Sequence, residues 1–288
     1  MTVWRLENER FQVEISETGG EISHIRDKRE SREWMWQPRA DVWNNSATQL
    51  FPVVGRLIHE GVWSEGQFLP LPAHGFLRRQ PFHRINNNSD QLVLEARSTP
   101  ETWAAWPWKW RVQVHITLHD EGLTFSQHIF NDDTRPFRYS VGWHPGFALP
   151  LATETGWWVD FGEEGVNGPF PTRERTLEIK DATPLTTQFP LTSEAFQAGA
   201  VYFGGSQQRQ IHIRRPDGVT VLTMETGAHD WLALWGVPGE DLLCIEPLAG
   251  TTDAPDFDGQ IQHKRGFRQL MPGNKQTFDV RLRFAMDA

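Results

Sequence analysis

The stretch Trp110-Arg111-Val112-Gln113-Val114-His115-Ile116-Thr117-Leu118-His119 alternates apolar and polar residues along its whole length. Because successive side chains of a β-strand point to opposite faces, it predicts a strand with one buried face and one solvated face. Glu121-Gly122 follows as a turn, and residues 123–130 run back as a second strand. Asn131-Asp132-Asp133 turns the chain again before a third strand at 136–143. Connections this short join antiparallel neighbours, so the region is predicted to be an antiparallel meander.

Outward from this meander, the same pattern predicts short strands along most of the chain. They are expected at 10–16, 21–26, 34–36, 90–98, 200–203, 209–214, 219–225, 231–235, 242–247 and 278–284, with a hairpin over 61–72. Well over a dozen short strands with turn residues between them are typical of a large β-sandwich. We therefore predict an all-β, antiparallel sandwich that forms a single domain over residues 1–288.

Little helix is expected. The best helix signal begins at Thr99-Pro100-Glu101 and is expected to end by about Trp106, because Pro107 cannot continue a helix. Residues 37–49 are interpreted as irregular polar coil. Residues 148–200 are interpreted as long loops, with a brief helix near 193–198.

Composition limits the partners. The net charge of −9 argues against nucleic acid and against an anionic membrane surface as partners. A single cysteine, Cys244, excludes an internal disulfide and a multi-cysteine zinc site. There is no apolar run that resembles a signal peptide, and no stretch approaches the ~18 apolar residues of a membrane span. We expect a soluble cytoplasmic protein, with most of its 14 tryptophans in the core or on sugar-stacking surfaces.

The third strand of the meander leads into a histidine among turn-forming residues. Pro145 biases His144 toward an extended backbone, and Gly142 and Gly146 leave room beside the imidazole for something to approach. The strand is expected to end here and to point His144 into a mouth. A histidine that only caps a turn is an equally good interpretation of this segment alone.

A second candidate follows the apolar run Leu242–Ile245, which predicts a buried strand that ends in Glu246 before Pro247. A buried carboxylate must be paired, hydrogen-bonded or raised in pKa. A raised pKa suits a general base that works near neutrality. The alternative is a glutamate that accepts bonds from backbone amides of a neighbouring loop. Cys244 is expected to point to the opposite face and to be inert core.

Four segments together are more specific than either candidate alone. The chain contains Phe51-Pro52-Val53-Val54-Gly55-Arg56, His74-Gly75-Phe76-Leu77-Arg78, Gly142-Trp143-His144-Pro145-Gly146-Phe147 and Cys244-Ile245-Glu246-Pro247, in this order. They match the forms F-P-x-x-G-R, H-G-F-x-R, G-x-H-P-x-F and C-I-E-P. The sequence thus resembles the galactose mutarotase (aldose 1-epimerase) family, and most closely its shorter bacterial branch. The opening strands and Leu270-Met271-Pro272-Gly273 fit the family too.

The resemblance implies a supersandwich of the galactose mutarotase type and the interconversion of the α and β anomers of an aldose. By position, His144 matches the general acid and Glu246 the general base, while His74 and Arg56 match residues that contact sugar oxygens. It implies no metal site and no organic cofactor. The expected partner is a small-molecule sugar, and the chain is expected to be a monomer or a homodimer.

The sugar itself stays open. The longer branch follows its histidine with an aromatic residue and asparagine, where this chain has Gly146, Phe147 and Ala148. The shorter branch often has tryptophan where this chain has Leu248. The family's hydroxyl-binding aspartate is expected near the strand at 200–203, and no acid is in register there.

Two other functions are alternatives. One is a carbohydrate-binding or sensing protein that kept the fold without catalysis. The other is a mutarotase for a phosphorylated or acidic sugar, which Arg56, Arg78 and Arg79 motivate. At single residues, His74 could instead cap a turn, and Arg56 could pair with Glu60.

Two further groups have ordinary explanations. His115 and His119, together with His128 on the next strand, are one candidate for a metal-binding site. A solvated polar face fits better, because no carboxylate or cysteine completes a site. Trp157-Trp158 could line the mouth of a pocket or pack a loop over a sheet.

Overall fold

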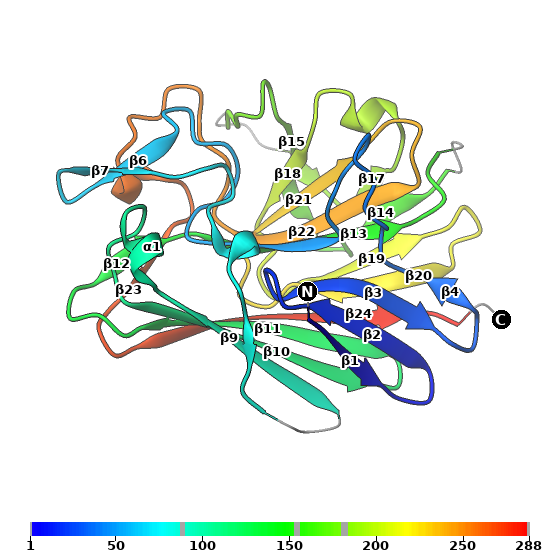
Figure 1. The fold of residues 1–288 in the computed structure, drawn as a ribbon. Helices are drawn as coiled ribbons and strands as arrows, with labels where there is room; N and C mark the ends of the chain where they lie inside the picture. The colour runs from blue at the N-terminus through cyan, green and yellow to red at the C-terminus, as the bar shows by residue number, and fades with distance from the viewer. Residues whose placement is uncertain (1, 87–89, 153–155, 180–183, 287–288) are drawn as a thin grey trace.

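The computed structural model describes residues 2–86, 90–152, 156–179 and 184–286, and these residues form an all-β fold in which every named strand pair is antiparallel. Two large sheets dominate (Figure 1). The nine-stranded sheet runs β17 (Gln188–Pro190), β14 (Trp158–Asp160), β19 (Gln210–Arg214), β20 (Thr220–Glu225), β24 (Lys275–Phe284), β11 (Gly122–Asn131), β10 (Trp110–His119), β9 (Gln91–Arg97), β8 (His83–Arg84). The seven-stranded sheet runs β16 (Leu185–Thr186), β15 (Val166–Pro171), β18 (Val201–Gly204), β21 (Trp231–Gly236), β22 (Leu242–Ala249), β13 (Val141–Ala148), β5 (Ala47–Leu50).

Smaller elements surround these two sheets. A four-stranded sheet contains β1 (Val3–Glu7), β2 (Phe11–Ser16), β3 (Glu21–Asp27) and β4 (Arg32–Glu33). The pairs are β6 (Gly61–Ser64) with β7 (Gln67–Pro70), and β12 (Phe137–Tyr139) with β23 (Arg268–Leu270). Helical turns are α1 (Pro100–Trp103) and the 3₁₀ turns Leu77–Arg79, Glu194–Phe196 and Ile261–His263. Within the described ranges, no helix is long and apolar enough to cross a membrane.

The predicted meander is confirmed at its first two strands. β10 pairs with β11 from Trp110 opposite Asn131 to His119 opposite Gly122, and burial along β10 alternates residue by residue. The third strand is divided in two. β12 ends at Tyr139 and pairs with β23, while β13 begins at Val141 and enters the seven-stranded sheet.

The two large sheets share one core. Figure 1 shows β13, β22 and β21 over β24, β11 and β10. Because side chains alternate along a strand, the odd-numbered residues of β13 and β22 face the core cluster that both sheets share, among them Trp143, Leu243 and Ile245. Trp143 stacks on Phe125 of β11, with ring centroids 4.3 Å apart. The even-numbered residues of the same strands therefore face outward, away from the nine-stranded sheet.

Several sequence predictions were wrong in detail. Residues 37–49 are not all coil, because β5 begins at Ala47. The region 148–200 contains the four short strands β14 to β17 as well as the 3₁₀ turn Glu194–Phe196. The strand expected at 34–36 lies instead at Arg32–Glu33. Strands of two to four residues are too short to show a period in the sequence.

The predicted helix is shorter than expected. It covers only Pro100–Trp103, between a capping box of Thr99 with Thr102 and the non-helical segment before Pro107. Four residues make about one turn, so the segment only connects β9 to β10.

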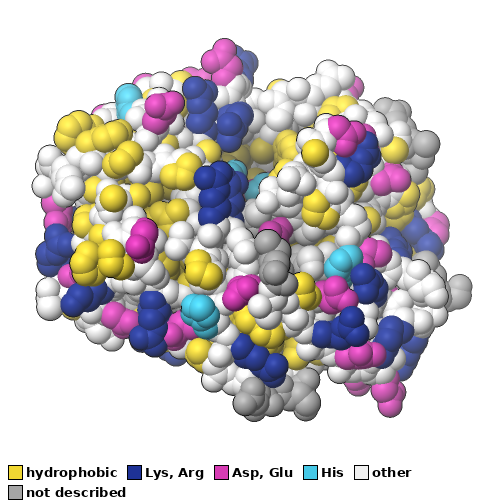
Figure 2. All heavy atoms as spheres, viewed as in Figure 1, with side chains coloured by type: hydrophobic (Ala, Val, Ile, Leu, Met, Phe, Trp, Pro, Cys, Tyr) yellow, Lys and Arg dark blue, Asp and Glu magenta, His cyan; other side chains and the backbone are white. Residues whose placement is uncertain are grey.

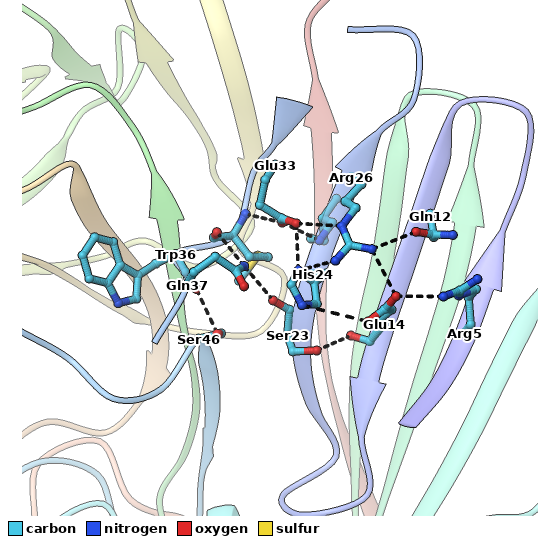
Figure 3. A network of polar contacts seen from close by, with 12 residues as sticks. Arg5, Gln12, Glu14, Ser23, His24, Arg26, Glu33, Trp36, Gln37 and Ser46 are labelled. Carbon is cyan, nitrogen blue, oxygen red and sulfur yellow. Dashed lines mark hydrogen bonds and ion pairs between the residues drawn. The ribbon is translucent and has the colours of Figure 1, made fainter. Parts of the chain in front are cut away.

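A polar network on the four-stranded sheet anchors the segment that leads into β5 (Figure 3). Arg26 Nη1 donates to Gln12 Oε1 and Glu14 Oε1 at 3.0 and 3.2 Å. Gln37 Nε2 donates to the Ser23 carbonyl at 3.2 Å, and Ser46 Oγ donates to the Trp36 carbonyl at 2.9 Å. The Gln37 bond ties the segment between β4 and β5 to β3, and the Ser46 bond joins two points within that segment.

Candidate active site

His144 and Glu246 lie opposite each other on neighbouring strands. β13 pairs with β22 through Gly142 with Leu248 and Gly146 with Cys244, so the three residues left between on each strand place His144 across from Glu246. His144 Nε2 is 3.3 Å from Glu246 Oε1. The sequence placed both residues at strand ends, but each lies inside a strand of the seven-stranded sheet.

A proline follows each of the two residues. Pro145 and Pro247 carry no N–H, so neither can donate a ladder bond, and each biases the residue before it toward an extended backbone. The strands therefore continue through His144-Pro145 and Glu246-Pro247 instead of turning. From the sequence, these prolines were interpreted as residues that end a strand in a turn. In the structure, both prolines lie inside extended strands.

The two residues open into one cavity of about 460 Å³ on the outward face of the seven-stranded sheet. All four residues predicted for the site, His144, Glu246, His74 and Arg56, line it. Figure 2 shows the hollow, with histidine at its floor and Lys or Arg side chains along one edge. Small-molecule sites typically have volumes of ~300–1,000 Å³, so the cavity can hold one sugar ring.

Burial moves the two pKa values in opposite directions. It raises the pKa of the Glu246 carboxyl to about 8, because the charged form loses its hydration. Burial, with the Arg78 charge as a lesser cause, lowers the pKa of the His144 imidazole to about 3. In the described part of the chain, no backbone amide donates to the Glu246 carboxyl, and its one polar contact is His144. The loop-amide alternative therefore does not describe this glutamate.

Two tryptophans hold the imidazole in place. Trp43 stacks on His144 with ring centroids 4.9 Å apart and an angle of 24° between planes. Trp235 lies edge-on to His144 at 6.1 Å. A Cβ on Gly146 would approach Trp43 Cζ3 to 2.6 Å, so this glycine makes room for an aromatic ring of the protein itself.

His74 is fixed by the Gly55–Arg56 segment. The Gly55 N–H donates to His74 Nδ1 at 3.1 Å, and the His74 N–H donates to the Gly55 carbonyl at 3.0 Å. Since Nδ1 accepts a bond, the neutral ring carries its proton on Nε2. Burial lowers the pKa of His74 well below its usual value, with His144 and Arg78 as further causes. A neutral His74 is thus a hydrogen-bond donor in the cavity rather than a charge.

Arg56 is held by a loop almost 200 residues away in sequence. Thr252 Oγ1 accepts from the Arg56 N–H at 3.0 Å, and the Asp253 N–H donates to the Arg56 carbonyl at 3.2 Å. Asp253 Oδ2 accepts from the Ile58 N–H at 2.9 Å, and Asp253 Oδ1 accepts from Lys264 Nζ at 2.6 Å. Within the described ranges Arg56 forms no ion pair with Glu60.

Several pocket residues were missed by sequence reasoning. Asn45, Thr48, Trp43, Tyr202, Trp235 and Arg175 line the cavity. Thr48, Tyr202 and Trp235 lie on the outward face of β5, β18 and β21. Thr48 is paired with His144 across β5 and β13. Ala233 of β21 is paired with Glu246 on one side and with Tyr202 on the other, which brings these strands into line with the site. Strand alternation was the available signal, but it needs the strand order to be known.

The position of Cys244 was predicted wrongly. It stands two residues before Glu246, so the period of two puts both on the same face of β22. Cys244 packs with Trp36 and Leu242 and is buried, and burial raises the pKa of its thiol well above the usual value.

The remaining aromatic and histidine candidates lie away from this cavity. His115 and His128 have ring centroids 4.2 Å apart on the face of the nine-stranded sheet, and burial lowers the pKa of His128 to about 4. Among the described residues, no group of three or more His, Cys, Asp or Glu side chains is arranged to hold a metal ion. Trp157 is buried against the main core, as expected for a loop packed over a sheet.

The chain belongs to the aldose 1-epimerase family, whose family model matches residues 2–283. The predicted family is thus confirmed.

Among curated proteins, the plasmid and chromosomal forms of protein LacX from Lactococcus lactis subsp. lactis are each 23% identical, over 97% of this chain and 99% of their own length. Among solved structures, a galactose mutarotase related enzyme from Lactobacillus acidophilus superposes with a TM-score of 0.92 at 25% identity, over 99% of this chain and 98% of its own. A galactose mutarotase-like protein from Lactobacillus casei gives a TM-score of 0.89 at 20% identity, over 99% and 100%. The predicted β-sandwich of the galactose mutarotase type is confirmed.

Proposed function

We propose that the protein is an aldose 1-epimerase that interconverts the α and β anomers of an aldose, with His144 and Glu246 as its acid–base pair. The observation that carries this proposal is one buried imidazole in contact with one buried carboxyl at the floor of a sugar-sized cavity. Both groups are ordinary catalysts of proton transfer, and positioned acid–base groups typically contribute ~10²–10⁴-fold each.

The reaction needs one proton accepted and one proton supplied. The pair reacts after its shared proton has moved from Glu246 to His144 across their 3.3 Å contact. Glu246 then takes the proton of the hydroxyl on C1, while His144 gives the shared proton to the ring oxygen O5. The C1–O5 bond breaks and the hydroxyl oxygen becomes the aldehyde oxygen. Rotation about C1–C2 exposes the other face of the aldehyde, and the two transfers then run in reverse to close the ring.

His144 and Glu246 lie side by side. Sequence reasoning had instead predicted two groups on opposite sides of the anomeric centre. The side-by-side arrangement suits the chemistry, because the two oxygens that exchange protons are bonded to the same carbon. Near neutrality the burial shifts leave the pair with one proton to share. After a proton is given to one oxygen and another is taken from the second, the pair again holds one.

His74 and Arg56 would orient the ring. His74 is poised as a neutral donor, and Arg56 keeps donors free beyond its bond to the Glu174 carbonyl at 2.6 Å. These two donors would bind hydroxyl oxygens of the sugar while His144 and Glu246 exchange protons with its O1 and O5 atoms. Trp43 and Trp235 give the apolar surface on which one face of a sugar ring can lie.

Exchange of the H1 signals of the two anomers, measured by NMR on α/β-glucose and α/β-galactose with and without enzyme, tests the proposal. Catalysed exchange above each sugar's own uncatalysed rate is expected. Saturable binding by titration calorimetry without faster exchange would instead support the sensing protein. Absence of both for every aldose, including phosphorylated ones, would contradict the proposal.

A further inference from the structure

The cavity contains positive charge that the reaction at C1 does not use. Arg56, Arg78 and Arg175 all line it, and Glu246 is the one carboxyl among the lining residues. Burial keeps that carboxyl largely protonated at neutral pH, since its pKa is about 8. A hollow with three guanidinium groups therefore lies in a protein whose net charge is −9.

These guanidinium groups have donors to spare. Arg78 Nη2 donates to the Ala73 carbonyl at 3.2 Å, and Arg56 donates to the Glu174 carbonyl. Across the described ranges, none of the three forms an ion pair, and the Arg175 side chain makes no hydrogen bond. Each guanidinium carries five N–H donors, so most N–H donors of the three arginines have no acceptor within the described residues.

Arg175 is held in place by a tight turn that closes with two backbone bonds between Arg173 and Thr176. Glu174 and Arg175 occupy its centre with φ of 47° and 64°, values that residues other than glycine seldom adopt. Arg56 Nη1 and Thr252 Oγ1 each donate at 2.6 Å to the carbonyls of these two central residues. Residues of the cavity thus fix an uncommon backbone that carries a charge to the cavity rim, and such backbones cluster at ligand sites.

Space continues beyond two of the arginines. Arg56 and Arg175 also line an adjoining cavity of about 540 Å³, in which Glu60 is the one acidic lining residue. The two arginines therefore stand at the boundary between the hollow over His144 and Glu246 and a second hollow. The space over His144 and Glu246 therefore extends past a single sugar ring on the side of Arg56 and Arg175.

The cavity wall has no carboxylate where one was expected from the sequence. The family's hydroxyl-binding aspartate was expected near the strand at 200–203, and the residues that line the cavity there are Gly199, Ala200 and Tyr202. The wall offers no carboxylate for a pair of hydroxyls, whereas the arginines offer paired donors that suit phosphate oxygens.

We propose that the substrate is an aldose phosphate, with its phosphate at the Arg56–Arg78–Arg175 cluster and its free C1 hydroxyl at His144 and Glu246. This inference rests on the proposed mutarotase function and names its substrate class. The phosphate lies on a carbon other than C1, because the anomeric hydroxyl must be free for the ring to open. A dianionic phosphate fits three guanidinium groups better than a single carboxylate does.

The test compares anomer exchange by NMR for glucose, glucose 6-phosphate, galactose 6-phosphate and glucuronate, with each uncatalysed rate subtracted. A hexose 6-phosphate is expected to have a kcat/KM at least about a hundredfold above that of glucose, because several charge-assisted hydrogen bonds would hold its phosphate. Glucuronate is expected to fall between the two.

Arg175→Gln is expected to reduce the ratio of kcat/KM for glucose 6-phosphate over glucose by about ten- to a hundredfold. Arg173→Gln is the matched control: it lies in the same turn, lines neither cavity, and should leave the ratio unchanged. Arg175→Lys, which keeps the charge, should recover part of the loss.

Equal kcat/KM for glucose and both hexose 6-phosphates would overturn the phosphate inference and leave the mutarotase intact. So would an equal effect of Arg175→Gln on both sugars, or a preference for glucuronate over both phosphates. If the unmodified protein catalysed exchange for none of the four sugars, the result would instead contradict the proposed mutarotase function.

Discussion

At the scale of residues, the central feature is a carboxyl and an imidazole that share one buried position. Glu246 and His144 are 3.3 Å apart, and each is disfavoured by burial in its charged form. Two groups this close titrate as a pair, so their protons belong to the pair rather than to either residue. Removal of one partner changes the protonation of the other as well as the chemistry.

Glu246→Gln and His144→Ala are each expected to lower kcat for anomer exchange by about 10²–10⁴-fold, because each removes one proton-transfer group. Anomer exchange by NMR on the most active sugar measures the loss, with far-UV circular dichroism as the check on folding. Thr48→Val, on the outward face of β5, changes a cavity residue without acid–base chemistry and should lose far less. Near-normal exchange by either of the first two variants would contradict the assigned roles.

The pH profile of kcat/KM should be flat through neutrality and fall above about pH 8. Above the raised pKa of Glu246 the pair loses its shared proton, so no acid remains for O5. On the acid side, the lowered pKa of His144 puts the loss of activity near pH 3, where a second proton occupies the pair. Measurement from pH 5 to 10, with the uncatalysed rate subtracted at each pH, checks the upper limb. A rate that keeps rising to pH 10 would refute this protonation scheme.

At the scale of elements, β13 positions the imidazole through the two glycines beside it. Gly146 leaves room for Trp43, which stacks on His144, whereas a Cβ on Gly142 would approach Leu248 Cδ2 to 2.4 Å. The two glycines flank His144 symmetrically on the same face. They therefore separate the effect of the stacked ring from the effect of crowding.

Gly146→Ala is expected to displace Trp43 and to cost about 1–3 kcal/mol of the free energy of unfolding, as overpacking usually does. It should also lower kcat at least several-fold, since the imidazole loses the ring that orients it. Gly142→Ala should cost similar stability with a smaller effect on kcat. Urea unfolding and NMR exchange measure the two effects, and equal loss of kcat in both variants would count against a positioning role for Trp43.

Sequence reasoning reached the elements that are long and regular. β10 was predicted because its ten residues show the period of two, and β11 was predicted because turn residues before and after it mark a strand that runs back along β10. β5 was missed because its four residues, Ala47–Leu50, are all buried and include Thr48 and Gln49, so no alternation is visible. β14 to β17 are at most six residues long; β15 contains Pro169, and β17 ends at Pro190.

The site was predictable only as far as its motifs. His144, Glu246, His74 and Arg56 were predicted because each stands in a short pattern that resembles a motif of the family, and all four line one cavity. Trp43 and Arg175 stand in no such pattern and lie outside the regular strands. What brings them to the cavity is the tertiary packing of the loops, which local periodicity does not encode.

At the scale of the whole molecule, one buried ion pair joins distant parts of the chain behind the rim. Lys264 and Asp253 are both buried, and Asp253 also accepts from the Ile58 N–H. The pair thus fastens the loop after Gly55 to the loops that follow β22. Since Arg56 belongs to the fastened segment, the pair maintains the shape of the cavity edge.

Lys264→Met is expected to lower the free energy of unfolding by about 3–5 kcal/mol, because it leaves the Asp253 charge buried without a partner. The double variant Asp253→Asn with Lys264→Met removes that charge, keeps an acceptor for Ile58, and should recover most of the loss. Urea unfolding of the three proteins gives the comparison. A double variant no more stable than the single one would show that the charge is not the cause.

The proposed acid–base pair lies on adjacent strands of a large sheet, whereas the groups that would hold the rest of the substrate belong to separate loops. Chemistry and selectivity can thus diverge independently: exchange of the 172–176 turn would retune which sugars are accepted without touching the machinery of ring opening. For protein engineering, a library could randomise the residues of this turn and keep the seven-stranded sheet unchanged.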